Sequence, residues 1–507
     1  MRNRNRIIKI FASVSGLIVV DKLIGFVKQM IVASAFGATT ETDIINLSQS
    51  AVTDIQYILS QALITAFITI YIHVQQGEGG SIEKSKQFAG DSIKAFSIIS
   101  FILTGILFFA SGILARVLAP SYTDELSRQL SFYIKLYSLI ILLFTLICIF
   151  KAVLNANKNF IPEQLVSFNQ SVITIAITII FGTLWGAKSL VISFFVFTIW
   201  NTIYLGVLCR KHVVINTLNP IKNPDIVSLF KMIGPLLLGY SLIYVNQMVD
   251  RMLVSGLGGG VITALTYGAV LSNLITTFIT TFCSIIFSYI TTEISTNNYD
   301  AASSIVGISV RNLSVLFMPI TITFIICSHE IVSIVYGRGA FGDNAVNSAS
   351  LALKGYAVMF VPVILREIYS RFQYAFKDSK RPMINGSIGI VGNIILSIIF
   401  CHYLGVFGVA LATSISVFVS AVLNMISAKN ISKDLDYNFL KKFSIKFSAI
   451  TVLSLILSVY TYHAMISVNS LFRLIVIFLS SITLFAIFFG KNIVMSFKEI
   501  KYLQQDD

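Results

Sequence analysis

Long apolar segments alternate with short polar ones along almost the whole chain. A helix that crosses the hydrocarbon core of a bilayer needs about 20 mostly apolar residues, and many of these segments are that long. We count fourteen of them, at 8–36, 44–73, 93–117, 130–154, 164–185, 189–209, 229–255, 261–291, 304–327, 346–374, 384–403, 406–428, 445–464 and 470–490. The pattern predicts an all-α polytopic membrane protein with 14 transmembrane helices.

The composition agrees with this prediction. Of the 507 residues, 56% are hydrophobic and 12% are charged, whereas a soluble domain has about 25% charged residues. No predicted loop is long enough for a soluble catalytic domain, so we do not expect an enzyme. The five Cys and five His are scattered without the spacing of metal ligands, and we therefore expect no metal and no other cofactor.

The net charge of +14 does not require nucleic acid as a partner, and we expect none. Most Lys and Arg fall in alternate loops, as the positive-inside rule predicts for cytoplasmic loops. This distribution predicts that both the N-terminus and the C-terminus are cytoplasmic. The basic residues on the predicted outer side are Arg116, Arg128, Lys188, Arg338 and Arg473.

A faint internal repeat divides the chain. MIVASAFG (30–37) aligns with MLVSGLGG (252–259) at a shift of 222, and NANKNFIP (155–162) aligns with AFKDSKRP (375–382) at a shift of 220. Both matches fall at corresponding places in two sets of six spans, so they predict a parallel repeat of the kind found in transporters. The predicted parts are an N-terminal lobe, a C-terminal lobe, and two last spans with a cytoplasmic tail, at 1–216, 217–432 and 433–507. We expect the two lobes to surround a central cavity.

The first span carries charges inside its apolar run. On a helix with 100° per residue, Asp21, Lys22, Gly25, Lys28 and Gln29 fall within an arc of about 120°. Each charge near the middle of a bilayer costs about 2.5–3.5 kcal/mol, so this face is expected to line a hydrated site. Two cations against one anion make the face basic and favour an anionic substrate.

Three further spans have polar stripes at helical spacing. We expect Asp43 of the second span to lie toward Lys28, and Asp54 to lie near the depth of Asp21 and Lys22. Pairing of charges with one another is the alternative, as for Asp250 with its neighbour Arg251. The stripes comprise Asp43, Asn46, Ser50, Asp54, Gln61 and Thr65 in the second span, Tyr240, Tyr244, Gln247 and Arg251 in the seventh, and Thr266, Asn273, Thr277, Thr280, Ser284 and Ser288 in the eighth. The tenth span adds Lys354, Arg366 and Glu367.

Four segments carry a resemblance to a known family. They are DKLIGFVKQMIVASAFGATTETD (21–43), VNQMVDRMLVSGLGGGVITALTYG (245–268), VYGRGAFG (335–342) and YSRFQYAFKDSKRP (369–382). Together they resemble the MurJ (MviN) lipid II flippases of the MOP transporter superfamily, and the matches run in order over most of the chain. The resemblance implies a V-shaped cavity that binds an undecaprenyl-diphosphate-linked sugar, lobes that rock to release it outward, and a bacterial cytoplasmic (inner) membrane location. It also implies that the last two spans form a groove for the lipid tail.

The resemblance transfers some residues and not others. The basic residues of the family's first span match Lys22 and Lys28, and its acidic residue at the start of the second span matches Asp43. Charged family positions fall at neutral residues in this chain, namely Gln29, Gln56, Gln61 and Val270. These departures leave open which lipid-linked saccharide is carried, and they are compatible with a diverged paralogue.

The sequence therefore predicts a flippase for lipid II or a related polysaccharide precursor, working as a monomer with membrane lipid around it and coupled to the membrane potential or an ion. Two alternatives stay open: a cation-coupled drug or metabolite antiporter of the same superfamily, and a non-transporting scaffold for envelope assembly. The residues expected to bind substrate are Lys22, Lys28, Asp43, Asp54, Gln56, Gln61, Tyr244, Gln247, Arg251 and Asn273.

Overall fold

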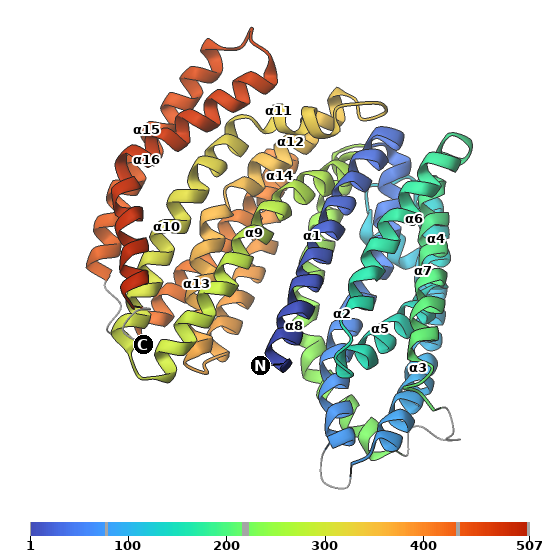
Figure 1. The fold of residues 1–507 in the computed structure, drawn as a ribbon. Coiled ribbons are helices and arrows are strands. Elements are labelled where there is room, and N and C mark those ends of the chain that lie inside the picture. Colours follow the sequence, from blue (N-terminus) through green and yellow to red (C-terminus); the bar gives the residue numbers. More distant parts are fainter. Residues whose placement is uncertain (1, 77–79, 215–222, 432–436, 504–507) are drawn as a thin grey trace. The chain divides into compact units, whose positions relative to one another are not determined.

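The fold is seen in a computed structural model, which describes residues 2–76, 80–214, 223–431 and 437–503 (Figure 1). Every regular element in these ranges is helical. The helices are α1 (Arg2–Phe36), α2 (Thr40–Gln76), α3 (Ile82–Leu118), α4 (Asp124–Ser138), α5 (Ile141–Ala156), α6 (Ile161–Trp185), α7 (Lys188–Cys209), α8 (Pro224–Val254), the short 3₁₀ helix η2 (Ser255–Leu257), α9 (Val261–Ser295), α10 (Tyr299–Ile326), α11 (Ser328–Tyr336), α12 (Asp343–Ala357), α13 (Phe360–Ala375), α14 (Lys380–Lys429), α15 (Tyr437–Ala464) and α16 (Ser470–Leu503).

The predicted class, an all-α polytopic membrane protein, is confirmed. By length and composition, ten helices in the described part of the chain can each cross a membrane, and up to twelve spans result if two bent helix pairs are counted as one span each. One of those ten, α14, contains two predicted spans, because Gly405 interrupts it with φ 58° and ψ −136°. The count of fourteen crossings stays a prediction.

Contacts divide the chain into two compact units. Unit 1 comprises Met1–Thr263 with Arg338–Gly342, and unit 2 comprises Ala264–Gly337 with Asp343–Asp507. α8 groups with unit 1 because it packs against α2 and α3, whereas the sequence repeat assigned it to the second lobe. The predicted boundaries at 216/217 and 432/433 fall outside the described residues, so the division by repeat stays a prediction.

Backbone conformation repeats along the chain as the sequence does. Gly186 and Gly405 have φ angles of 57° and 58°, and Lys158 and Lys377 have φ angles of 60° and 62°. The members of each pair are separated by 219 positions. Left-handed backbone is costly for a residue with a side chain, so its recurrence at Lys158 and Lys377, each just beyond a helix end, supports a duplicated helical unit.

The interior of unit 1 is partly polar. Aromatic side chains of α2 and α3 pack there, with the rings of Phe67 and Phe88 5.1 Å apart. Beside them, Thr145 of α5 accepts hydrogen bonds from Gln56 and from Ser100, at 3.0 and 2.7 Å. Because a buried polar group must find a partner away from water, this network fixes the rotation of α2 against α3 and α5.

Close helix approaches in unit 2 depend on glycine. A Cβ atom added to Gly268 of α9 would lie 2.7 Å from Cβ of Ala352 in α12, and one added to Gly355 of α12 would lie 2.6 Å from Cβ of Ala410 in α14. Small residues at helix contacts are how membrane proteins bring backbones together. They fix α9, whose polar stripe the sequence singled out, against α12.

Candidate functional site

The charged face of α1 lies in unit 1, where α1 packs against α6. Lys22 is exposed, and Lys28 and Asp21 are half-buried. Asp21 lies within electrostatic reach of both lysines and of Lys151 in α5. The two ammonium groups therefore belong to one basic region, with a single carboxylate beside them.

Gly25 occupies the middle of this face. A Cβ atom at Gly25 would lie 3.8 Å from Oγ of Ser171 in α6. That is an ordinary van der Waals distance, so α1 lies beside α6 here without an approach that requires glycine. Lys22 lies three residues before it and remains accessible on the surface of unit 1.

Asp43 has a well-defined structural environment. It is fully buried, and its carboxylate accepts hydrogen bonds from the backbone N–H groups of Gly260, Ile262 and Thr263 at 2.7, 3.4 and 2.7 Å. These groups begin α9, where the first N–H groups have no partner within the helix. Asp43 therefore caps α9, and these contacts give it partners other than Lys28, toward which we expected it to lie.

The loop before α4 lies near this cap. Tyr122 is half-buried there, and burial, followed by the nearby charge of Asp43, raises the pKa of its hydroxyl. Ser121 Oγ lies 3.5 Å from Ser255 Oγ at the start of η2. The start of α2, the loop before α4 and the end of α8 thus meet at one end of unit 1.

α2 and α8 form a second polar region. Asp54 accepts a hydrogen bond from Arg251, with side-chain exposures of 9% and 20%. The ring of Tyr57 stacks on that of Tyr244, with centroids 6.1 Å apart and an interplanar angle of 13°. Gln61 and Gln247 are exposed. We call these six residues the α2–α8 surface.

The structure brings together five of the residues predicted to bind substrate, on this one surface. The sequence analysis missed Tyr57 as a sixth member. The signal was present, because Tyr57 lies three residues after Asp54 and four before Gln61, and such positions share a helix face.

Gln56, also in the predicted set, lies apart from the α2–α8 surface. It is 2% exposed, and its amide faces Thr145 in the interior of unit 1 instead of lying on the α2–α8 surface. The physical reason is helical phase: two residues after Asp54, Gln56 lies about 200° around the helix. The resemblance selected this position, and the local polar spacing did not.

Asn273 belongs to α9 in unit 2, where it is exposed. Its carbonyl accepts hydrogen bonds from Thr276 and Thr277 at 3.2 and 2.7 Å. Other hydroxyls of the stripe likewise donate to backbone carbonyls one turn earlier, as Ser284 does to Thr280 at 2.8 Å. Their oxygen lone pairs make α9 a surface that can accept hydrogen bonds.

Unit 2 has two charge clusters of its own. Glu367 of α13 pairs with Arg366 at 2.9 Å and with Arg371 at 3.2 Å. Glu330 of α11 and Arg473 of α16 form a buried pair at 2.9 Å. Neither cluster resembles a metal site, and within the described ranges no group of three or more His, Cys, Asp or Glu could hold a metal ion.

A helical membrane fold with a basic first helix and a polar α2–α8 surface is typical of a transporter for an anionic or amphiphilic substrate. The sequence profile of the family described as lipid II flippase MurJ matches residues 32–483. The chain belongs to this family.

Relatives and solved structures agree with this assignment. A probable lipid II flippase MurJ of Rickettsia prowazekii is 23% identical over 409 residues, covering 78% of this chain and 79% of the relative. That of Vibrio cholerae is 22% identical over 435 residues, covering 82% of each. A solved lipid II flippase MurJ in an inward closed conformation superposes with a TM-score of 0.78 at 22% identity, over 94% of this chain and 99% of that one.

A second kind of neighbour shares the fold. An inward-facing multidrug resistance MATE transporter of the MOP superfamily superposes with a TM-score of 0.66 at 14% identity, over 82% of this chain and 96% of that one. At such identities the similarity concerns the fold alone. The families found are those of transporters and not of enzymes.

Proposed function

We propose that this protein flips an undecaprenyl-diphosphate-linked saccharide, with lipid II as the first candidate, from the cytoplasmic to the outer leaflet by alternating access. The observation that carries the proposal is the pair of lysines on α1, in a chain of the MurJ family. Lys22 is exposed in a helix that is otherwise largely apolar. Charges in such a position mark substrate pathways in membrane proteins.

Lys22 and Lys28 would bind the diphosphate. An ammonium group acts on phosphate as a compact point charge with three donors, and two of them suit a group with two phosphates. Asp21 lies within reach of both lysines and offsets part of their charge when no substrate is bound. Asp43 would act indirectly: it caps α9 and thereby holds the start of α2 against the start of α9.

The α2–α8 surface would bind the saccharide. Tyr57 and Tyr244 present flat amphipathic rings, and these suit the apolar face of a sugar ring. Gln61 and Gln247 each bring an amide that can both donate to and accept from sugar hydroxyls. Arg251, held by Asp54, completes the surface with a fixed cation.

The membrane potential favours export in the predicted orientation. With a cytoplasm-negative potential of 100 mV, each negative charge moved outward gains about 2.3 kcal/mol. The diphosphate carries such charge, so the proposal needs no cofactor. An added counter-ion stays open.

The choice of saccharide rests on the neutral residues at charged family positions. Gln56 is buried and hydrogen-bonded to Thr145. A neutral residue at this charged family position therefore alters the interior of unit 1. Gln61 is exposed. A neutral residue at this charged family position therefore removes a charge from the surface that a saccharide would contact. The carried saccharide would therefore be lipid II or a related precursor that places less charge near Gln61.

The experiment is a flipping assay in proteoliposomes with three substrates: lipid II, an undecaprenyl-diphosphate disaccharide without peptide, and a phospholipid of the bilayer. The proposal predicts protein-dependent flipping of at least one undecaprenyl-linked substrate. Flipping of none of them by correctly inserted protein would contradict it and favour a scaffold. Export of cationic drugs by the same vesicles would favour the antiporter alternative.

A further inference from the structure

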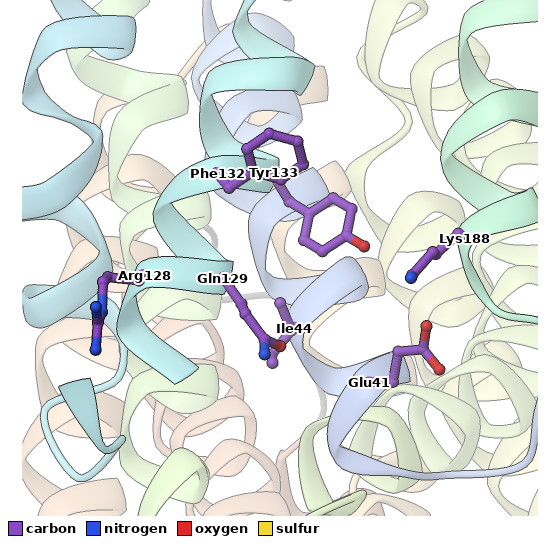
Figure 2. Close-up of a pocket in the computed structure, with 7 residues that line it drawn as sticks. All are labelled: Glu41, Ile44, Arg128, Gln129, Phe132, Tyr133 and Lys188. Atoms are coloured by element: carbon purple, nitrogen blue, oxygen red, sulfur yellow. The ribbon is translucent and has the colours of Figure 1, made fainter. Parts of the chain in front are cut away.

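A pocket of about 600 Å³ lies in unit 1, where α2, α4 and α7 begin. It is distinct from the basic face of α1 and from the α2–α8 surface. The first turns of α2 and α7 and the middle of α4 contribute a mixture of charged, polar and aromatic groups. The lining residues are Glu41, Ile44, Arg128, Gln129, Phe132, Tyr133 and Lys188 (Figure 2).

Polar groups from three helices converge on the pocket. Figure 2 shows the hydroxyl of Tyr133, the ammonium group of Lys188 and the carboxylate of Glu41 turned toward one space. Arg128 also lines the pocket, but Figure 2 shows its guanidinium on the side of α4 away from Lys188 and Glu41; its Nε donates to the carbonyl of Asp124 at 3.2 Å. The space shared by the first three groups thus has one cation, Lys188, and one carboxylate, Glu41.

The face of α7 that bears Lys188 continues as an apolar stripe. Relative to Lys188, the next residues of the stripe fall within an arc of about 80° at helical spacing. Each is at least 36% exposed, and they are Ile192, Val196, Ile199 and Ile203. An exposed apolar stripe on a membrane-spanning helix faces lipid chains.

Aromatic residues mark the level of the pocket in the membrane. Phe132 in the lining and Trp185 at the end of α6 are 56% and 45% exposed. Trp and other aromatic residues gather where lipid headgroups meet water. A polar pocket at this level, next to an apolar stripe, can accept both the polar headgroup and the apolar chain of a lipid molecule.

We propose that this pocket binds a glycerophospholipid whose headgroup carries a hydrogen-bond donor beyond its phosphate. Lys188 binds the phosphate, with the Tyr133 hydroxyl and the Gln129 amide as further donors. Glu41 accepts a hydrogen bond from the ethanolamine or glycerol end of the headgroup. One acyl chain lies along the stripe of α7.

Charge complementarity selects this occupant. The phosphodiester carries one negative charge, which suits the ammonium group of Lys188, and the far end of the headgroup would meet the carboxylate of Glu41. Glu41 would discriminate among headgroups, because ethanolamine and glycerol can donate a hydrogen bond to a carboxylate and choline cannot. The preferred order is therefore phosphatidylethanolamine and phosphatidylglycerol ahead of phosphatidylcholine.

The test is native mass spectrometry of the full chain, incubated in detergent with equal amounts of the three lipids. We expect wild type to retain phosphatidylethanolamine or phosphatidylglycerol over phosphatidylcholine. Lys188→Ala should lower this retention about fivefold, the equivalent of about 1 kcal/mol for a basic residue at a membrane surface. Glu41→Gln should reduce the preference over phosphatidylcholine. Arg116→Ala is the matched control, because Arg116 ends α3 and does not line the pocket.

Three results would overturn the proposal: equal retention of the three lipids by wild type, unchanged retention in Lys188→Ala, or an equal loss in Arg116→Ala. Circular dichroism and thermal unfolding check that each variant is folded. If Lys188→Ala is unfolded, the headgroup preference of Glu41→Gln decides between the outcomes, since this substitution preserves size. None of these outcomes depends on the proposed flipping activity.

Discussion

Arg251 of α8 donates a hydrogen bond to Asp54 of α2, across 197 positions of sequence. The pair is mostly buried, with 20% and 9% of the two side chains exposed. It fixes the relative position of two helices that contribute Tyr57 and Tyr244 to one stacked contact. The ion pair is therefore both a structural link and part of the α2–α8 surface.

Breaking this pair should destabilise unit 1. Arg251→Met leaves the carboxylate of Asp54 without its cation, and we expect a loss of about 1.5–3 kcal/mol in the free energy of unfolding, as for a hydrogen bond to a charged group. The double variant Asp54→Asn/Arg251→Met should lose less than the sum of the single variants. A double-mutant cycle on chemical unfolding checks the coupling, and additive losses would contradict it.

Asp43 should behave as a helix cap. Asn is also a good capping residue, whereas Ala is not, so Asp43→Asn should retain most of the stability and Asp43→Ala should lose about 0.5–2 kcal/mol. Thermal unfolding and flipping rate are measured on both. If Asp43→Asn abolishes flipping at unchanged stability, the carboxylate has a charge-dependent role that capping does not explain.

The tyrosine pair should matter for the saccharide through its rings. Tyr57→Phe keeps the ring stacked on Tyr244, and it should leave the apparent KM for substrate nearly unchanged. Tyr57→Ala removes the ring, and we expect a rise in KM of about 2- to 12-fold, which corresponds to about 0.5–1.5 kcal/mol for an aromatic contact. Equal effects of the two substitutions would show that the hydroxyl, and not the ring, is used.

The buried pair Glu330–Arg473 should anchor α16 to α11. Arg473 also lies over the ring of Tyr462 in α15, 4.6 Å from its centroid. Arg473→Leu leaves a buried carboxylate unpaired, which costs about 3–5 kcal/mol. The double variant Glu330→Gln/Arg473→Leu removes that charge and should recover part of the loss. Thermal unfolding of the full-length protein measures these losses. If the double variant recovers none of the stability lost in Arg473→Leu, the ion pair is not the anchor.

Local patterns predicted the helices and most of their polar faces. Hydropathy located the helical segments, and helical phase placed Asp54 with Gln61, and Tyr244 with Arg251, because these relationships lie within one helix. The turns at Gly186 and Gly405 were also predictable, since each interrupts an apolar run, and both adopt left-handed backbone. Such features depend on neighbours a few residues apart.

Contacts between distant segments could not be predicted in the same way. Arg251 pairs with Asp54 because α8 packs on α2, and spacing within a single helix does not predict such a contact. The cap provided by Asp43 depends on Gly260, which leaves α9 without a capping side chain of its own. Helical phase predicts that Gln56 points away from Asp54 and Gln61, whereas the family resemblance placed it among the substrate-binding residues.

The most direct test of the account is whether the lysines of α1 bind diphosphate. Binding of undecaprenyl diphosphate to the purified full chain is measured for wild type, Lys22→Ala/Lys28→Ala, Lys22→Arg/Lys28→Arg, and Lys211→Ala as a control in the loop after α7. The account predicts that the double alanine variant loses at least tenfold in affinity, and that the arginine variant and the control keep most of it. Wild-type affinity in a folded double alanine variant would contradict the central claim.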